Sequence, residues 1–440
     1  MTRKLALAGT VAAIAATVFL LGGALSPAPD AEPAVGPLPA SSAVAERSLA
    51  GFRIGNTVQL VERLQASLRR RPEDVRSLQL LGLAYEQRAR ETADPSYYPK
   101  AEGVLRHALR LAPNDAVATS GLGSLALARH RFRDALALGR RAVALAPKTA
   151  RNWGIVGDAL IELGRYDEAF RAFDTMIRLE PDLPAYARIS YARELLGRPQ
   201  AAIRPMQAAV DASGFEREPF AWTSVQLGKL LWSVGRIDAA GEQYRLALRF
   251  FPGYVHALDA LAQVEAARGR LKRAIELERR AVDAMPLPQF AGALGDLYRV
   301  AGKPALARRQ YALVGAIERL LNANGVKTDL EAALFNADHG IRPGDTLARA
   351  RLAQRERPSI DGNDVLAWTL ERNGRCAEAL YYSKRALRLG TKDALKFFHR
   401  GMIERCLGNR AESKRWLRRA LALNPHFSIL WSPTARKLAA

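Results

Sequence analysis

The sequence predicts an all-α solenoid of about ten helix-turn-helix units, and three observations support this. In unit after unit, a glycine or alanine is followed 12 residues later by an alanine. A glycine falls between the two helices of most units, and a proline follows the second helix of several. Of the 440 residues, 49% are hydrophobic and 25% are charged, so the chain can bury a large core. We expect the solenoid to cover residues 53–427.

The N-terminus predicts export. A short basic patch, MTRK, precedes residues 5–25, which carry no charge and are about long enough to span a bilayer. We therefore expect residues 1–26 to be a cleaved signal peptide or a retained membrane anchor, with the basic side inside. The Pro/Ala-rich stretch at 27–52 is typical of a linker. The protein is expected to be extracytoplasmic, either secreted or anchored to the cytoplasmic membrane.

The first units depart from the regular spacing. The segment NTVQLVERLQASLRRRP indicates a lone second helix that opens the stack. In the first full unit Ala101 follows Gly82 by 19 residues, so ARETADPSYYPKAEG contains seven additional residues. Pro95 bars continuation of the first helix, and DPS is typical of a turn that caps the second. Tyr97 and Tyr98 would then either cover apolar surface near the end of the stack or contact a partner.

The clearest unit is WGIVGDALIELGRYDEAFRAFDTMIRLEP, residues 153–181. Small side chains at Gly157 and Ala169 let two helices approach closely, and Gly164 separates them. Matching small, apolar and helix-ending residues recur at Gly228, Gly235, Ala240, Tyr244, Ala247 and Pro252, and at Ala262, Gly269, Ala274, Ala281 and Pro286. This pattern resembles the tetratricopeptide repeat. More narrowly, the segments ADPSYYPKAE and ALFNADHG resemble parts of exported tetratricopeptide proteins from high-GC bacteria. The resemblance implies a right-handed superhelix in which each unit packs against its neighbours.

The C-terminal end is expected to close the stack. The segment FSILW, residues 427–431, predicts apolar contacts with the last unit. We expect residues 428–440 to form a cap or tail.

Motifs that carry chemistry are absent from the sequence. It contains no Gly-rich phosphate loop, no HExxH, no histidine pair at metal-binding spacing and no nucleophile motif. We therefore predict no catalytic residue, no metal site and no cofactor, and we expect the protein not to be an enzyme. His339, near the end of a predicted first helix, is interpreted as a cap.

The family resemblance places partners in a concave groove lined by first helices. The residues projected into that groove are Tyr191, Trp222, Lys229, Trp232, Gln263, Asp296, Arg299 and Trp368. Trp222 and Trp232, with Lys229 between them, suggest an aromatic patch suited to a peptide or an unstructured segment. The alternative is that one or both tryptophans pack between neighbouring helices.

The charge balance is strongly basic and unevenly placed. There are 66 basic and 44 acidic residues, giving +22, and 54 of the basic residues are arginines. A surplus of this size favours anionic surfaces, although it also fits arginines spread over solvated helix faces. The arginines crowd second helices, in GRRAVALAP, ERRAVDAMP and RWLRRALAL. The projection also places Glu86, Asp158, Glu162, Glu194, Asp259 and Glu371 in the groove, which therefore leans acidic. Nucleic acid is therefore an unlikely partner for the groove.

The two cysteines, Cys376 and Cys406, allow a single internal pairing. They are expected at the same edge of adjacent units, and an exported chain meets an oxidising environment. A disulfide and two buried thiols both fit the sequence.

Two functions fit these observations. The first is a non-enzymatic scaffold that binds protein or peptide partners in its groove outside the cytoplasmic membrane. The second is a binder of anionic envelope polymers or of the membrane surface through an Arg-rich convex face. Binding by arginines should collapse between low and moderate salt, whereas aromatic groove binding should largely survive.

Overall fold

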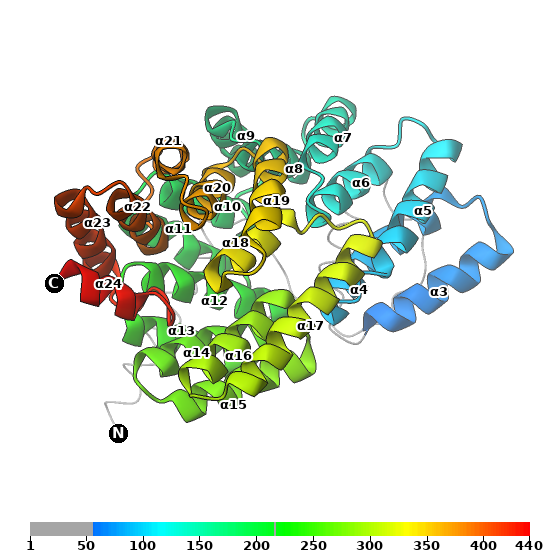
Figure 1. Cartoon of the computed structure of the whole chain (residues 1–440). Coiled ribbons are helices and arrows are strands. Elements are labelled where there is room, and N and C mark those ends of the chain that lie inside the picture. Colours follow the sequence, from blue (N-terminus) through cyan, green and yellow to red (C-terminus); the bar gives the residue numbers. More distant parts are fainter. Residues whose placement is uncertain (1–55, 215–216) are drawn as a thin grey trace, which may run out of the picture. The chain divides into compact units, whose positions relative to one another are not determined.

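The computed structural model describes residues 56–214 and 217–440 (Figure 1). The predicted signal peptide or anchor, residues 1–26, and the predicted linker, residues 27–52, lie outside these residues. Within them, no helix has both the length and the apolar character needed to cross a membrane.

All regular structure in the described part of the chain is helical. The helices are α3 (Asn56–Arg70), α4 (Val75–Thr92), α5 (Tyr97–Leu111), α6 (Ala116–Ala128), α7 (Phe132–Leu145), α8 (Ala150–Glu162), α9 (Tyr166–Leu179), α10 (Leu183–Leu195), α11 (Pro199–Ala212), α12 (Arg217–Ser233), α13 (Ile237–Phe250), α14 (Val255–Ala267), α15 (Leu271–Ala284), α16 (Pro288–Val300), α17 (Pro304–Ala323), α18 (Asp329–His339), α19 (Pro343–Glu356), α20 (Ile360–Arg372), α21 (Cys376–Ala386), α22 (Ala394–Cys406), α23 (Arg410–Leu423) and α24 (Ser432–Ala439).

The helices pack as consecutive pairs, which confirms the predicted α-solenoid. The first pair is α4 with α5 and the last is α22 with α23, so the described residues contain ten pairs. Helix α3 precedes the first pair and packs on α4, and α24 follows the last pair and packs on α23. The predicted number of units and the lone opening helix both agree with this arrangement.

The two helices of a unit begin in different ways. Several first helices start at an acidic or hydroxyl side chain that accepts hydrogen bonds from the first turn, as Asp115 does from the Ala118 N–H at 2.6 Å and Ser359 from the Gly362 N–H at 3.2 Å. Most second helices instead follow a glycine in the left-handed region, such as Gly269 at φ +75°. These local signals set the helix boundaries that the period predicts.

Glycines on first helices make room for large side chains on second helices. A Cβ atom on Gly157 would overlap the ring of Phe173, and one on Gly228 would overlap the ring of Tyr244. Phe173 and Tyr244 are themselves buried. The glycine of the sequence period therefore holds the place where the aromatic ring of the paired helix enters.

The seven additional residues of the first unit extend its first helix. Helix α4 continues to Thr92, and the Asp94 carboxylate then accepts a hydrogen bond from the Ser96 N–H at 2.9 Å before α5 begins. Tyr97 and Tyr98 are half-buried and pack against the core of the first units, where the rings of Tyr97 and Tyr85 lie 5.9 Å apart. Both tyrosines therefore cover apolar surface of their own unit.

The C-terminal segment packs apolar side chains on the last unit. The rings of Phe427 and Trp431 lie 5.6 Å and 5.5 Å from that of Phe398, which is fully buried. Helix α24 follows directly, and Ala435 and Ala439 belong to the same core cluster. The final residues thus cover the end of the stack with a short helix.

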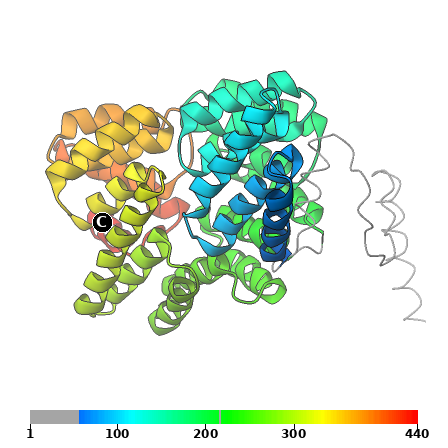
Figure 2. The same cartoon turned by 90° about the vertical axis from the view of Figure 1, so that its right-hand side faces the viewer.

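Helices of the second half also pack against units far back in the sequence, along a line of contacts that we call the seam. Tyr166 Oη accepts a hydrogen bond from the Ile360 N–H at 2.7 Å. Asn424 Nδ2 donates to the Trp232 carbonyl oxygen at 2.8 Å, and Thr391 Oγ1 donates to the Leu195 carbonyl oxygen. The partners in these three bonds are 192 to 196 residues apart in sequence. Figure 2 shows the orange helices of the second half beside the cyan and green helices of the first.

Backbone meets backbone along the seam at three glycines. A Cβ on Gly164, Gly197 or Gly235 would run into a carbonyl oxygen, respectively that of Pro358, Gly390 or Leu423. Each glycine ends a first helix, and each carbonyl lies in or beside a loop that joins one unit to the next. The expectation that units pack only against their neighbours is therefore incomplete, because side-chain-free turns let distant loops approach.

Candidate functional site

The predicted groove residues differ widely in exposure. Tyr191 and Trp222 are 38% and 37% exposed. Lys229, Gln263 and Arg299 are also exposed, whereas Trp232 and Asp296 are partly buried. Trp368 is completely buried. The eight residues therefore do not form one continuous exposed surface.

Trp368 faces the core and not the groove, which corrects the expectation for this residue. Its ring stacks on His399 at 4.5 Å and meets Trp431 edge-on at 5.6 Å. The indole nitrogens of Trp368 and Trp431 both donate to Asp338 at 2.9 Å. The side chain is buried because the C-terminal segment covers it.

Asp296 is held in a polar cluster. Its Oδ1 accepts hydrogen bonds from Tyr311 Oη at 2.8 Å and lies 2.7 Å from His339 Nε2. His339 Nδ1 lies 2.6 Å from the Phe335 carbonyl oxygen of its own helix. Burial alone would lower the pKa of His339, but Asp296 outweighs burial and raises it. His339 therefore does more than end α18, since it joins α18 to α16.

Three of the sequence-predicted groove positions come together at the seam. Tyr191 and Glu194 on α10, with Trp232 on α12, line a cavity of about 250 Å³ that we call the seam recess. The opposite wall comes from the start of α20, the loop before α22, and the first turn of α22. The recess exists because the seam brings these elements together.

A buried lysine forms one wall of the recess. Lys396 Nζ lies 2.8 Å from Asp361 and 2.7 Å from Asp393. Burial alone would lower the pKa of Lys396, but the two carboxylates outweigh it and raise that pKa well above its usual value. The charges of Asp361 and Asp393 are therefore largely satisfied within the wall.

Glu194 is the recess carboxylate without such a partner. It forms no ion pair with any of the described residues. Burial, followed by the nearby charges of Asp393 and Asp361, raises its pKa to about 7. One helical turn earlier, burial, followed by the charges of Asp361 and Glu162, raises the pKa of Tyr191 well above its usual value. The recess therefore holds a partly exposed tyrosine beside a carboxylate that has no cationic partner within the described part of the chain.

The charged surface continues from the recess along first helices. The positive charge of Lys229 on α12 acts on Glu194, on Asp259 and on His256. Burial raises the pKa of Asp259 to about 6, and burial together with Lys229 lowers that of His256 to about 4. Lys229 thus faces several acidic and neutral groups from neighbouring units.

Cys376 and Cys406 form a disulfide in the structure, with their Cα atoms 5.8 Å apart. Cys376 is the first residue of α21, and Cys406 is the last residue of α22. The bond therefore joins adjacent units at one edge, where the sequence placed the two cysteines. We predict that the two thiols are oxidised in solution, and chemical labelling tests this prediction.

Sequence reasoning missed Asp361, Lys396 and Thr391 as recess residues. They lie at the starts of first helices or in a loop. The repeat pattern predicts groove positions only in the middle of each first helix. No signal in the period relates positions that are nearly 200 residues apart. Among the described residues, no group of three metal-ligating side chains is present.

The comparisons with known proteins agree with the helical pairs. A family model described as tetratricopeptide repeat matches residues 120–184, 156–216 and 225–287. This chain therefore contains tetratricopeptide repeats. The matched units of this repeat protein include α10 and α12, which carry Tyr191, Glu194 and Trp232. No curated protein sequence matches the chain significantly.

Solved structures similar to this repeat protein include three that span different lengths. YrrB, described as a TPR protein with an unusual peptide-binding site, is 21% identical over 43% of this chain and 95% of its own, with a TM-score of 0.29. TTC0263, described as a thermophilic TPR protein in Thermus thermophilus, is 23% identical over 44% of this chain and 98% of its own, with a TM-score of 0.38. Human IFIT1, solved as a dimer with m7Gppp-AAAA, is 15% identical over 75% of this chain and 76% of its own, with a TM-score of 0.47.

Proposed function

We propose that this protein is a non-enzymatic scaffold that binds an extended segment of a partner polypeptide at the seam recess. The segment would carry a lysine or arginine whose cation meets the Glu194 carboxylate beside the Tyr191 and Trp232 rings. The observation that carries the proposal is the unpaired Glu194 next to the exposed Tyr191. A desolvated carboxylate without a partner gains most from a cation, and aromatic faces add to that attraction.

The site of action that we propose is outside the cytoplasmic membrane. Support comes from residues 1–26, where a basic patch precedes an uncharged stretch long enough to direct export. The same segment would tether the scaffold to that membrane if it is retained.

Selection from a random peptide library displayed on phage tests the recess. We expect enriched peptides to contain lysine or arginine, and we expect Glu194→Gln and Tyr191→Ala each to weaken the best peptide by roughly tenfold in fluorescence polarisation. The matched controls are Glu242→Gln on α13 and Tyr381→Ala on α21, which are exposed residues outside the recess. Peptides that bind all four variants equally well would show that the recess is not the binding site.

A second candidate function is binding to anionic envelope polymers or membrane surface through arginines. The observation in its favour is that second helices carry well-exposed guanidinium groups, including Arg106, Arg140 and Arg415 at 60%, 53% and 70% side-chain exposure. Such binding should collapse between low and moderate salt, whereas peptide binding in the recess should largely persist.

A further inference from the structure

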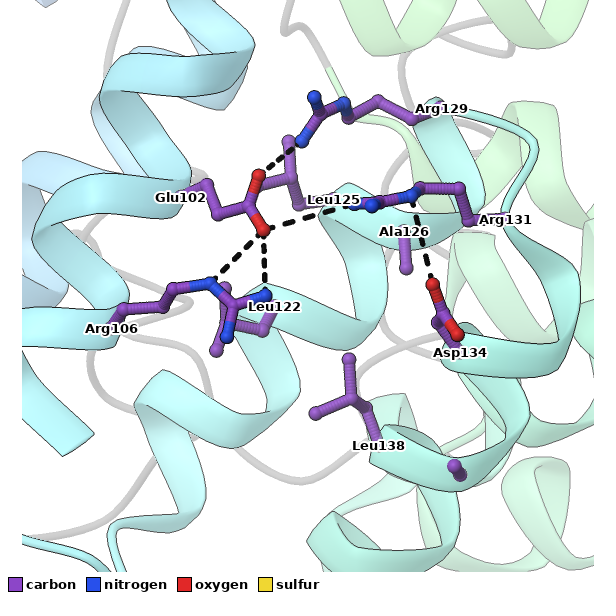
Figure 3. A pocket seen from close by; sticks show the side chains of 10 residues that line it. Glu102, Arg106, Leu122, Leu125, Ala126, Arg129, Arg131, Asp134 and Leu138 are labelled. Carbon is purple, nitrogen blue, oxygen red and sulfur yellow. Dashed lines mark hydrogen bonds and ion pairs between the residues drawn. The ribbon is translucent and has the colours of Figure 1, made fainter. Parts of the chain in front are cut away.

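A second cavity, of about 310 Å³, lies between helices α5, α6 and α7 (Figure 3). Its floor is apolar, formed by Leu122, Leu125 and Ala126 on α6 with Leu138 on α7. Leu122 and Leu125 are 6% and 2% exposed, so they belong to the core and present only a small apolar surface to the cavity. We call this cavity the arginine pocket, because three arginines line it.

The three guanidinium groups surround a single carboxylate. Arg106 Nε and Nη2 donate to Glu102 Oε1 at 3.0 Å and 2.7 Å, and Arg129 Nη1 donates to Glu102 Oε2. Arg129 is buried, and its Nη2 also donates to the Asn324 carbonyl oxygen at 2.9 Å. Burial alone would raise the pKa of Glu102, but the bonds from Arg106 and Arg129 outweigh it, so the pKa is lowered and the group stays ionised. Arg129 and Glu102 thus form a fixed wall.

Arg131 has unused hydrogen-bonding capacity. Its guanidinium lies 3.7 Å from Glu102 and 3.6 Å from Asp134, which is too far for a hydrogen bond to either carboxylate. Within the described residues, its side chain makes no hydrogen bond. Figure 3 shows Arg131 opposite Arg106 across the Glu102 carboxylate. Five donors on a planar group at the cavity rim are therefore available to an anion.

The charges of the pocket do not balance. Arg106, Arg129 and Arg131 face the carboxylates of Glu102 and Asp134, which leaves one positive charge. Asp134 is 62% exposed on its side chain and pairs with Arg131 at 3.6 Å without a hydrogen bond, so rotation of Asp134 into solvent would leave two positive charges. A dianion matches that excess better than a carboxylate does, and paired guanidinium groups suit phosphate oxygens.

We propose that the arginine pocket binds a phosphate monoester that carries a short apolar chain. Arg131 and the exposed edge of Arg106 hold the phosphate, and the chain lies on the leucine floor. The phosphate belongs either to a soluble metabolite or to a lipid headgroup, and the chemistry of recognition is shared. This proposal does not depend on polypeptide binding, because the pocket and the seam recess have no lining residue in common.

Isothermal titration of the full chain with hexyl phosphate, inorganic phosphate and hexanoate tests the pocket. We expect hexyl phosphate to bind at least about tenfold more tightly than inorganic phosphate, because each buried methylene contributes about 0.8 kcal/mol, roughly fourfold in affinity. We expect a preference of at least about tenfold over hexanoate as well, because the dianionic head group can bond both guanidinium groups. Sedimentation with phosphatidylcholine vesicles that contain phosphatidic acid distinguishes a lipid source from a soluble one. Binding to the vesicles without binding to hexyl phosphate would assign the site to lipid.

The decisive variant is Arg106→Gln with Arg131→Gln, which leaves the buried Arg129 in place. It should weaken binding of hexyl phosphate by roughly tenfold or more. The matched control is Arg140→Gln, which removes an exposed arginine of α7 that does not line the pocket. Arg140→Gln should change binding of hexyl phosphate less than about twofold.

Three outcomes would overturn the proposal. One is that neither hexyl phosphate nor the phosphatidic acid vesicles bind. Another is equal affinity for inorganic phosphate and hexyl phosphate, since the apolar floor would then have no role. The third is an equal loss in the Arg140→Gln control, which would show a general effect of net charge. Retention of binding by Trp232→Ala would separate this site from the seam recess.

Discussion

The Glu194 carboxylate lowers the stability of the free protein but would favour binding of a cationic partner. Its carboxyl is desolvated on α10, and no ion pair within the described structure compensates it. A group that costs stability in the free protein is common where a ligand supplies the missing partner. The proposed cation would be that partner. The loss of stability caused by Glu194 is then explained by binding and not by a need of the fold.

Glu194→Gln is predicted to stabilise the free protein at pH 8. The folded pKa of about 7 lies above the ordinary value of 4.5, so the contribution of Glu194 to stability is fully present below pH 4.5 and is lost as pH rises through 7. The uncharged amide avoids that loss, and we expect a gain of roughly 1–3 kcal/mol at pH 8 by chemical denaturation. At pH 4 the difference should nearly vanish.

The exposed Glu242→Gln serves as the control for this measurement and should change stability little at either pH. Equal stability of Glu194→Gln and the unmodified protein at pH 8 would contradict the assignment of Glu194 as an uncompensated carboxylate.

At the residue scale, sequence reasoning identified part of the site and misplaced part. Tyr191, Glu194 and Trp232 project from first helices as the period predicts, and the structure brings them to one recess. Trp368 occupies an equivalent helical position but is covered by Trp431 from the C-terminal segment. A helical projection gives the face of a residue, but it does not show whether a distant segment covers that face.

At the element scale, local signals accounted for the helix pairs. Glycine in the turn, an apolar face and a small residue at the close approach of two helices are all local, and the ten pairs follow from them. The sequence allows the first helix of this unit either to run on through EQRARET or to fray there, because no residue of that stretch stops a helix before Pro95. In the structure α4 runs on to Thr92. Elements are thus predictable to the extent that their boundaries depend on nearby residues.

The Cys376–Cys406 bond should link adjacent units in solution. Intact-mass measurement after thiol alkylation without reductant should find neither cysteine labelled. Reduction should lower the free energy of unfolding by about 3–4 kcal/mol if loop entropy dominates, because the bond closes a loop of 30 residues.

The variant Cys376→Ser with Cys406→Ser provides the control, since reductant should not change its stability. Two labelled cysteines in the unreduced protein would show that the thiols are free and would remove the cross-link from any account of stability.

At the scale of the whole molecule, the seam changes how the repeats depend on one another. In a solenoid with contacts only between neighbours, stability is close to a sum over units and adjacent interfaces. Here Glu162 and Arg357 add an ion pair across the seam, with Arg357 Nη2 3.0 Å from Glu162 Oε1. The sequence period could not predict these contacts. It describes the spacing of residues within a unit, whereas the contacts depend on how far the superhelix turns over several units.

Gly197→Ala is predicted to loosen two regions that are far apart in sequence. Gly197 has φ +69°, and an added Cβ would run into the Gly390 carbonyl oxygen. Gly269→Ala is the matched control, because Gly269 occupies the same kind of turn at φ +75° with nothing within 4 Å of the added Cβ. Both substitutions carry a backbone cost of about 1–2 kcal/mol, and only Gly197→Ala adds the collision across the seam.

Hydrogen exchange measured by mass spectrometry separates the two effects. In Gly197→Ala, faster exchange should appear in residues 388–393 as well as near the substituted turn, because the loop that carries Gly390 must move away. In Gly269→Ala, faster exchange should stay within α14, α15 and the adjoining units. If faster exchange is confined to neighbouring units in both variants, the seam contacts contribute little to the free energy of unfolding. Faster exchange on both sides of the seam would show that contacts across it stabilise both halves of the solenoid.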